Sequence, residues 1–413
     1  MTDPIPKPAE FDSSRPLIVY IGPFAFPGGG AAARRILGNA QGLVAAGYQV
    51  LILSGQQAES EAVRKVAPGI FLASTSERDA EHLPRALRLV RYALMGSKSR
   101  RWMDRLSARP YAVLLYSGYT PYILQLKGWC RRNGVPLLFD AVEWYTATSP
   151  LGLITSPYLW QIEFAMRRLI PRLDGVIAIS GYLRDWFNQA HIPVVQVPPT
   201  LDVRAVIPGE GGGQKRLSLV YAGTPGQSKD QLGEIIAAVR ALDPQGRDLV
   251  LNLYGPTADQ IRQLLATAGH TVPQAVVAHG PVDHAVAMAA VGRADFSILT
   301  RRRNRVSSAG FPTKFVESLA MGTPVIANLT GDMGNYLRDG ENGLVCDSAC
   351  AVSIGAALRR ALALTDRQRC EMRARARATA ETAFDYREYV DRLQYLVQTA
   401  AYAMDGSKVR TGI

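Results

Sequence analysis

Residues 17–30 read LIVYIGPFAFPGGG, an apolar run that ends at Gly22 and continues into a loop rich in proline and glycine. The run over 16–22 predicts a buried strand. The helix formers of 31–46, followed by Gly47, predict a helix that begins directly after the loop. A strand, a glycine loop and a helix in this order are typical of the first unit of a parallel α/β sheet.

The same alternation of apolar runs and helix-forming stretches continues along the first half of the chain. Further strands are predicted at 49–54, 111–116, 135–139, 175–179 and 194–197. Pro198-Pro199 and the glycine-rich stretch 209–213 then interrupt the pattern, which favours a domain boundary there.

The alternation starts afresh after this boundary. Strands are predicted at 217–222, 249–254, 275–279, 296–299, 324–328 and 343–346, and the stretch 366–404 is predicted as helix. We therefore expect an α/β protein with two Rossmann-like, doubly wound parallel-sheet domains that face a central cleft. The predicted domains are 1–205 and 206–385, and a helical segment, 386–413, is expected to pack back on the first domain.

Composition narrows the class of protein. The chain has 413 residues, 47% of them hydrophobic and 20% charged, which is enough apolar surface for two cores. The longest apolar runs have strand length, far below the roughly 20 residues of a membrane span. The polar start, 1–14, carries no secretory signal, so we expect the cytosol. Four scattered cysteines without a C-x-x-C pair favour free thiols over a metal site or disulfides.

The formal net charge of +12 favours an anionic partner. Arg85, Arg88 and Arg91 recur at a spacing of three within the basic, amphipathic segment 85–105. This pattern predicts a peripheral contact with an anionic membrane, or else a helix with one solvated basic face. The run 301–305 contains four arginines but no aromatic residues, so nucleic acid is not expected as a partner.

Ligands of open parallel sheets bind beyond the carboxyl ends of the strands, so the loops that follow strands are the candidate sites. Gly28, Gly29 and Gly30 lead into a helix start that can hold an anion, although the loop could also carry no ligand. The second strand ends in 54–56, Ser-Gly-Gln, without the carboxylate that a dinucleotide ribose needs, which argues against a nicotinamide cofactor.

Two further loops carry charge. In 221–230, Lys229 follows Gly223 by six residues and could neutralise a diphosphate, or could be a solvated surface lysine. In 310–326, GFPTKFVESLAMGTPVI, a loop leads into a short helix on which Lys314 and Glu317 lie three residues apart. These two could hold a phosphate and a sugar hydroxyl, or could form a surface ion pair.

The segment 310–326 resembles the donor-binding signature of retaining glycosyltransferases with the two-domain B-type fold (GT-B), and of family 4 (GT4) in particular. Members of this family often build bacterial polysaccharides. The resemblance covers nearly the whole chain. Other stretches that match the family in the same order are 28–30, 223–229, 253–256, 277–282 and 339–345.

The resemblance implies a role for each matching residue. Glu317 would bind the ribose hydroxyls, Lys229 would stabilise the leaving diphosphate, and Gly280 would face the base. The implied donor-binding set is Gly28, Gly29, Gly30, Gly223, Thr224, Lys229, Gly280, Arg301, Phe311, Pro312, Thr313, Lys314 and Glu317.

The chain departs from the family pattern at three points. Ala309 stands where a second glutamate is usual, and Thr224 stands where an arginine is usual, so Lys314 or Arg301–Arg303 could supply the missing charge. Asp140 or Glu143 could replace the usual histidine near the reacting sugar, or could cap the following helix. No Asp-x-Asp motif occurs, which predicts a reaction without a metal.

The expected function is transfer of a hexosyl unit from a nucleoside-diphosphate sugar, with UDP or GDP as the nucleotide, to a glycan or lipid-linked acceptor hydroxyl. Retention of configuration is expected, with no cofactor and with Asp140, Glu143 and Lys229 as the catalytic candidates. Polysaccharide or glycolipid synthesis at the inner face of the membrane would follow. The alternatives are a sugar-nucleotide 2-epimerase of the same fold and an inactive protein that binds nucleotide or glycan.

Overall fold

The computed structural model describes residues 11–28, 30–57, 62–77, 91–116, 118–146, 156–211, 215–223, 230–266, 269 and 271–410. Its contacts divide the chain into two compact units. Unit 1 comprises Met1–Leu201 together with Tyr386–Ile413, and unit 2 comprises Asp202–Asp385. The C-terminal helix therefore belongs to the same unit as the N-terminal half of the chain.

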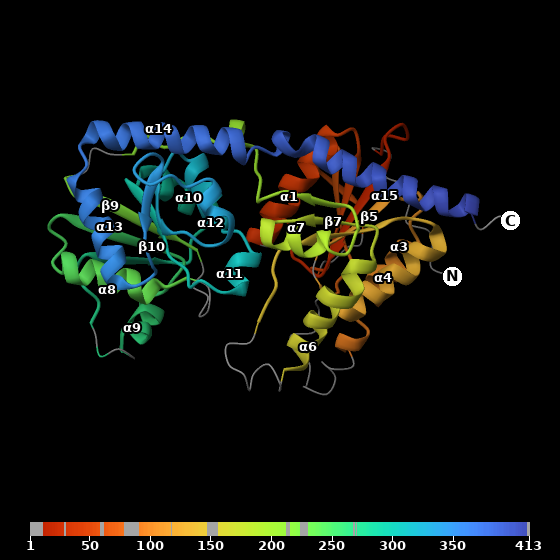
Figure 1. Cartoon of the computed structure of the whole chain (residues 1–413), viewed down its shortest axis with the longest axis horizontal. Coiled ribbons are helices and arrows are strands. Elements are labelled where there is room, and N and C mark those ends of the chain that lie inside the picture. The colour runs from red at the N-terminus through yellow and green to blue at the C-terminus, as the bar shows by residue number, and fades with distance from the viewer. Residues whose placement is uncertain are drawn as a thin grey trace. The chain divides into compact units, whose positions relative to one another are not determined.

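Unit 1 alternates strands and helices (Figure 1). Its strands are β1 (Leu17–Gly22), β2 (Gln49–Ser54), β3 (Arg64–Ala67), β4 (Ile70–Ser74), β5 (Ala112–Tyr116), β6 (Leu137–Ala141), β7 (Gly175–Ala178) and β8 (Val194–Gln196). Its α-helices are α1 (Gly30–Ala45), α3 (Ser97–Asp104), α4 (Thr120–Asn133), α6 (Pro157–Phe164), α7 (Gly181–Asn188) and α15 (Val390–Arg410). A π-helical turn, Ala165–Leu169, and a 3-10 turn, Ile170–Arg172, continue α6, and another 3-10 turn, Tyr386–Tyr389, precedes α15.

The strands of unit 1 form one sheet in the order β3-β4-β2-β1-β5-β6-β7-β8. All neighbours are parallel except β3, which pairs antiparallel with β4 at the edge. Every residue of β1 and β2 is buried, because helices cover both faces of such a sheet. On α15, Leu393, Leu396 and Val397 are buried in the same cluster as Ile36 and Leu43 of α1, so the C-terminal helix completes this core.

Unit 2 repeats this plan with a smaller sheet. Its strands are β9 (Leu217–Ala222), β10 (Leu249–Tyr254), β11 (Val276–Gly280), β12 (Phe296–Leu299), β13 (Val325–Asn328) and β14 (Gly343–Cys346). Its α-helices are α8 (Leu232–Leu242), α9 (Ala258–Ala266), α10 (His284–Arg293), α11 (Arg305–Ala309), α12 (Thr313–Ala320), α13 (Ala351–Ala363) and α14 (Asp366–Ala383). Two 3-10 turns lie at Val203–Ala205 and Gly331–Asn335. The strand order is β11-β10-β9-β12-β13-β14, and all pairs are parallel.

The two parallel, Rossmann-like sheets confirm the predicted fold class. Every strand predicted from the sequence is present within two residues of its expected ends. Strands β3 and β4 were not predicted from the sequence. Strand β3 reads RKVA and is largely exposed, so it lacks the apolar pattern that identifies a buried strand.

Each sheet has one topological switch point, where the strand order changes direction. It lies between β1 and β5 in unit 1 and between β9 and β12 in unit 2. The loops after these strands border a crevice at the carboxyl edge, where open α/β sheets bind ligands. Among the described residues, no helix combines the length and the apolar character needed to cross a membrane.

Candidate active site

The switch point of unit 2, which we call its crevice, lies between the neighbouring strands β9 and β12. Gly223 follows β9 directly, and Arg301 follows β12 by two residues. Helix α12 begins at Thr313 and carries Lys314 in its first turn. The backbone of Arg301 is held in place by Asn328 at the end of β13, which accepts from its N–H and donates to its carbonyl oxygen, each at 2.8 Å.

Asp230 connects the cations of this crevice. Its Oδ2 lies 2.5 Å from Lys314 Nζ and accepts from the Tyr221 hydroxyl at 2.8 Å, while its Oδ1 accepts from Arg301 Nε at 2.9 Å. The Lys314 ammonium also lies 4.0 Å from the centre of the Tyr221 ring, a favourable cation–π distance. Two cations and one carboxylate leave a net positive charge at the carboxyl edge of the sheet.

The protonation of this cluster follows from burial and charge. Burial alone would raise the pKa of Asp230, but Lys314 and Arg301 outweigh it and lower that pKa to about 2. Burial lowers the pKa of Lys314 from its ordinary value, against the opposing effect of Asp230. Burial and the nearby Asp230 carboxylate raise the pKa of the Tyr221 hydroxyl, which therefore stays protonated. Asp230 is thus ionised at neutral pH and pairs with the Arg301 guanidinium.

Gly223 makes room for the lysine. Its φ of 148° lies in a region that other residues rarely adopt, and a Cβ atom there would collide with Cε of Lys314. The Gly223 N–H donates to the carbonyl oxygen of Tyr254 at 2.8 Å, which fixes the loop to β10. Glycine at this position therefore lets the backbone and the lysine side chain approach each other closely.

Glu317 lies one turn after Lys314 on α12 and is largely buried. Its Oε1 lies 2.9 Å from Nε2 of His284, the first residue of α10. Lys314 and Glu317 are close enough for the carboxylate to favour the charged lysine. The pair with His284 gives the carboxylate a fixed orientation.

The remaining predicted donor residues of unit 2 differ in their surroundings. Phe311 is buried in an aromatic cluster with Phe315, Tyr336 and Phe384. Its ring therefore anchors the residues just before α12 to the core of unit 2. Pro312 is buried at the N-cap of α12, and Thr313 is partly exposed. Gly280 ends β11 with a φ of 70°, and open space surrounds the position of its absent Cβ.

Ala309 occupies the position of the missing glutamate and is completely buried. A Cβ added to the neighbouring Gly331 would lie only 2.9 Å from the carbonyl oxygen of Ser307 and 3.3 Å from that of Ser308. The backbone is therefore tightly packed around the position where the family usually carries this carboxylate.

Some predicted site residues lie outside the described part of the chain. These are Gly29, Thr224 and Lys229. Their assigned roles stay predictions. The observed cluster of Lys314, Arg301 and Asp230 begins directly after the segment that contains Lys229.

In unit 1, Gly28 and Gly30 flank the start of α1. Both are exposed, and nothing lies within 4 Å of a Cβ added at either position. Gly30 has a φ of 63°, which glycine adopts without strain. The loop therefore leaves backbone groups open to a ligand at the carboxyl end of β1.

Asp140, a catalytic candidate, lies in a closed network at the end of β6. Its carboxylate accepts from Arg35 Nη2 at 2.6 Å, from Asn39 Nδ2 at 3.3 Å and from the Tyr20 hydroxyl. Arg35 also donates to the carbonyl oxygens of Val197 and Pro198. Because Asp140 and Arg35 are both buried, the geometry favours a role in holding α1 to the sheet over contact with a sugar.

Glu143, the other candidate carboxylate, follows β6 by two residues and is partly exposed. Its negative charge helps to raise the pKa values of the Tyr116 and Tyr158 hydroxyls, after burial as the larger cause. Of the two carboxylates proposed to stand near the reacting sugar, Glu143 is the accessible one.

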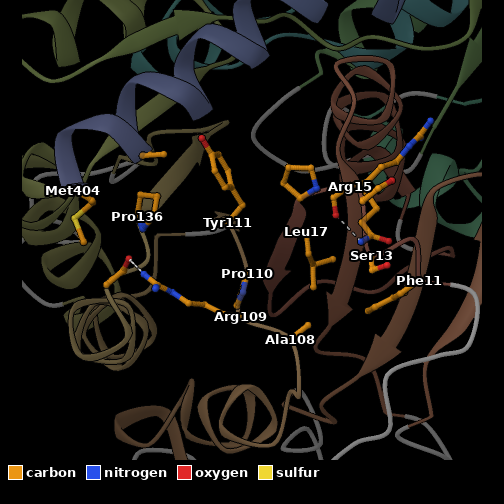
Figure 2. A pocket seen from close by; sticks show the side chains of 15 residues that line it. Phe11, Ser13, Arg15, Leu17, Ala108, Arg109, Pro110, Tyr111, Pro136 and Met404 are labelled. Atoms are coloured by element: carbon orange, nitrogen blue, oxygen red, sulfur yellow. Dashed lines mark hydrogen bonds between the residues drawn. The ribbon is translucent and has the colours of Figure 1, made fainter. Parts of the chain in front are cut away.

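A hollow of about 510 Å³ lies elsewhere in unit 1 (Figure 2). It is lined by Leu17 and Gln49, which begin β1 and β2, and by Tyr111, just before β5. Arg109 reaches across to the carbonyl oxygen of Gly134. The hollow therefore lies at the amino edge of the sheet, opposite the edge that carries the glycine loop.

Two family models match successive parts of the chain. Residues 30–200 match the glycosyl transferase 4-like domain, and residues 216–363 match the glycosyl transferases group 1 family. The chain belongs to the group 1 (GT4) glycosyltransferases. The resemblance noted from residues 310–326 is thereby confirmed.

Relatives of this glycosyltransferase are distant. The D-inositol 3-phosphate glycosyltransferase of Actinosynnema mirum is 26% identical over 268 residues, which span 57% of this chain and 63% of that relative. The sucrose-phosphate synthase of Thermosynechococcus elongatus is 16% identical, with a TM-score of 0.71 over 94% of this chain and all of that one. HepE of Anabaena, solved with UDP-glucose, is 14% identical, with a TM-score of 0.61 over 95% of this chain and 100% of that one. The solved structures establish the GT-B fold.

Two residues of the glycosyltransferase site were not predicted. Asp230 directly follows Lys229 at the end of the stretch 221–230, but its contacts to Lys314 and Arg301 cross 84 and 71 positions of sequence. His284 lies four residues after Gly280, and a histidine at a helix start gave no signal that it would face Glu317. In the described part of the chain, no three histidine, cysteine or acidic side chains lie close enough to hold a metal ion together.

Proposed function

We propose that this glycosyltransferase moves a hexosyl unit from a nucleoside-diphosphate sugar to an acceptor hydroxyl. The observation that carries the proposal is the cationic crevice of unit 2, where Lys314 and Arg301 lie beside Gly223 at the β9–β12 switch point. A diphosphate there would meet both cations and the backbone N–H groups that begin α12.

In this arrangement the cations act on the leaving group. Negative charge grows on the diphosphate as the sugar bond breaks, and fixed cations at that place lower the barrier. Lys314 and Arg301 could supply the charge that a metal supplies in other transferases, so we propose a reaction without a metal. Glu317, held by His284, would accept hydrogen bonds from the ribose hydroxyls.

Other parts of the proposal rest on family membership. Retention of configuration and a role in polysaccharide or glycolipid synthesis are typical of the family. Lys229 would add a further cation, and Glu143 would stand near the transferred sugar. We propose UDP or GDP as the nucleotide, and the four free cysteines fit a reducing compartment such as the cytoplasm.

The expected membrane contact through 85–105 remains a prediction, because Arg85 and Arg88 lie outside the described residues. In the described part, Trp102 and Met103 of α3 are buried, and Arg100 bonds Gln125 of α4. The apolar residues of α3 therefore serve the core.

The test begins with thermal shift measurements in UDP-, GDP- and ADP-sugars. A donor at 100 times its Kd should stabilise the fold by roughly 2.7 kcal/mol. Release of nucleoside diphosphate that requires an acceptor supports transfer. Conversion of the sugar nucleotide without such release would identify an epimerase, and binding without turnover would identify an inactive binding protein; either result would refute the proposal.

A further inference from the structure

Tyrosines gather beyond the carboxyl ends of β5 and β6 in unit 1. Tyr119 is the N-cap of α4, Tyr145 follows β6 by four residues, and Tyr158 lies in the first turn of α6. The ring centres of Tyr119 and Tyr158 are 6.0 Å apart, and those of Tyr145 and Tyr158 are 6.4 Å apart. Tyr92 contacts Tyr119 with a distance of 6.0 Å between ring centres. We call Tyr92, Tyr119, Tyr145 and Tyr158 the tyrosine cluster.

The tyrosine cluster is partly covered by its own contacts and partly open to solvent. Tyr158 contacts two of the other rings and still exposes 41% of its surface, and the remaining three tyrosines are partly exposed. Trp144, the residue before Tyr145, is instead buried and donates its indole N–H to Glu163. Because the tryptophan enters the core while the tyrosines stay at the surface, the cluster presents aromatic rings to a ligand.

Two buried polar atoms at the tyrosine cluster have no hydrogen-bond partner among the residues that the structure describes. They are the hydroxyl oxygen of Tyr92 and Nε2 of Gln161. The side chain of Gln161 is fixed beside Tyr119, because the N–H of the next residue, Thr120, donates to its Oε1 at 2.8 Å. The Thr120 hydroxyl also donates to the Gln161 carbonyl oxygen at 2.8 Å. Since buried polar groups are nearly always hydrogen-bonded, these two atoms indicate a partner from outside the chain.

The hydroxyls of the cluster are hydrogen-bond donors. Burial, and after it the neighbouring Tyr119, raises the pKa of the Tyr158 hydroxyl, and the charge of Glu143 adds to this effect. Burial likewise raises the pKa of the Tyr92 hydroxyl. Both hydroxyls therefore stay protonated at neutral pH, and the Glu143 carboxylate lies near Tyr158 as an acceptor.

The chemistry of these groups matches a sugar ring. A pyranose carries C–H groups on its faces, which pack on aromatic rings, and hydroxyls around its edge, which bond amide, hydroxyl and carboxylate groups. The negative charge of Glu143 disfavours a phosphorylated sugar at the same place.

We propose that the tyrosine cluster, together with Gln161 and Glu143, binds the acceptor as an uncharged pyranose of a glycan. One face of the sugar ring would pack on Tyr158. The sugar hydroxyls would bond Gln161 Nε2, the Tyr92 hydroxyl and the Glu143 carboxylate. The loops after β5 and β6 lie at the same edge of the parallel sheet as the glycine loop after β1. This inference rests on the proposed transfer reaction and narrows its acceptor to an uncharged sugar.

The first experiment measures sugar binding by saturation-transfer NMR on the full chain without nucleotide. The probes are the methyl pyranosides of glucose, galactose and mannose, and the 6-phosphates of the same three sugars. At least one methyl pyranoside should bind, with the strongest transfer to the C–H protons of one ring face, and its phosphorylated counterpart should bind more weakly. Binding of the phosphates alone, or of none of the uncharged sugars, would overturn the proposal.

Variants of the cluster locate this binding. Tyr158→Ser should weaken binding of the pyranoside about ten-fold, whereas Tyr158→Phe, which keeps the ring, should retain most of it. Gln161→Glu keeps an acceptor for the Thr120 N–H but removes the amide donors, and should weaken binding about three- to ten-fold. The matched control Tyr395→Ser removes an exposed tyrosine from α15 of the same unit and should bind as the parent does. Equal binding by the parent and Tyr158→Ser, or equal losses in Tyr158→Ser and Tyr395→Ser, would contradict the proposed site.

Transfer kinetics separate this inference from the proposed function. In Tyr158→Ser and Gln161→Glu, the KM for the acceptor should rise by the same factors by which sugar binding weakens, while the Kd of the nucleoside diphosphate stays unchanged. If the protein transfers a sugar but both variants keep the acceptor KM of the parent, the acceptor site is refuted and the transfer reaction stands. Sugar binding without transfer to any acceptor would instead refute the proposed function.

Discussion

Replacing Arg35 with methionine tests the closed network at the end of β6. The substitution keeps most of the side-chain volume but leaves the Asp140 carboxylate buried beside Tyr20 and Asn39 without its cation. It also removes the donor to the carbonyl oxygens of Val197 and Pro198. We expect a large loss of stability.

The magnitude follows from the burial of both partners, which expose only 3% and 0% of their side chains. Breaking such a pair by removing one charge costs about 3–5 kcal/mol, whereas an exposed pair costs well under that. For a unit of roughly 200 residues, this corresponds to a fall in melting temperature of about 6–20 °C.

Thermal and urea unfolding of the parent, Arg35→Met, Asp140→Leu and the double variant measure the effect. The losses of unfolding free energy in the two single variants should add up to about 2 kcal/mol more than the loss in the double variant. The reason is that the double variant buries no unpaired charge. Arg359→Met, at an exposed site, should change stability by less than about 0.5 kcal/mol. If Arg35→Met costs less than about 1 kcal/mol, the buried ion pair does not form as described, and Asp140 becomes available for a catalytic role.

Two other perturbations address the crevice of unit 2. His284→Ala should raise the KM for the donor about three- to ten-fold with little change in kcat, because it removes one hydrogen bond that orients Glu317. His284→Gln should restore most of the affinity for the donor. An unchanged KM in His284→Ala would contradict this role. Lys314 and Arg301 hold the pKa of Asp230 near 2, below its value of about 3.9 in the unfolded chain. The ion pairs of Asp230 therefore stabilise unit 2 above about pH 4. About 2 kcal/mol of unfolding free energy is lost as the pH falls toward 2. Acid unfolding of Asp230→Asn should lack this component, and an identical acid transition in parent and variant would refute it.

The strands of both units could be predicted because parallel strands buried on both faces read as continuous apolar runs, such as 17–22 and 217–222. The exposed strand β3 has no such run and was missed. Strand β4 was also missed, although it reads IFLAS and is fully buried. Runs of similar length at 175–179 and 296–299 were predicted as strands, so the sequence contained the same signal for β4.

The site was predictable only where one segment contains both partners. Lys314 and Glu317 share a helical turn, so their neighbourhood followed from a spacing of three. Asp230 and His284 meet those residues only through the strand order of the sheet. For the same reason, the sequence could not reveal that Arg35, 105 positions before Asp140, neutralises that carboxylate in the core.

Calorimetric titration with the nucleoside diphosphate of the identified donor tests the central claim most directly. If Lys314 and Arg301 grip the diphosphate, Lys314→Gln and Arg301→Gln should each weaken binding about 10- to 150-fold, the value of one charge-assisted hydrogen bond. Arg302→Gln, which removes an exposed neighbour bonded to Gln231, should bind almost as the parent does. Equal affinities for the parent, Lys314→Gln and Arg301→Gln would contradict the account.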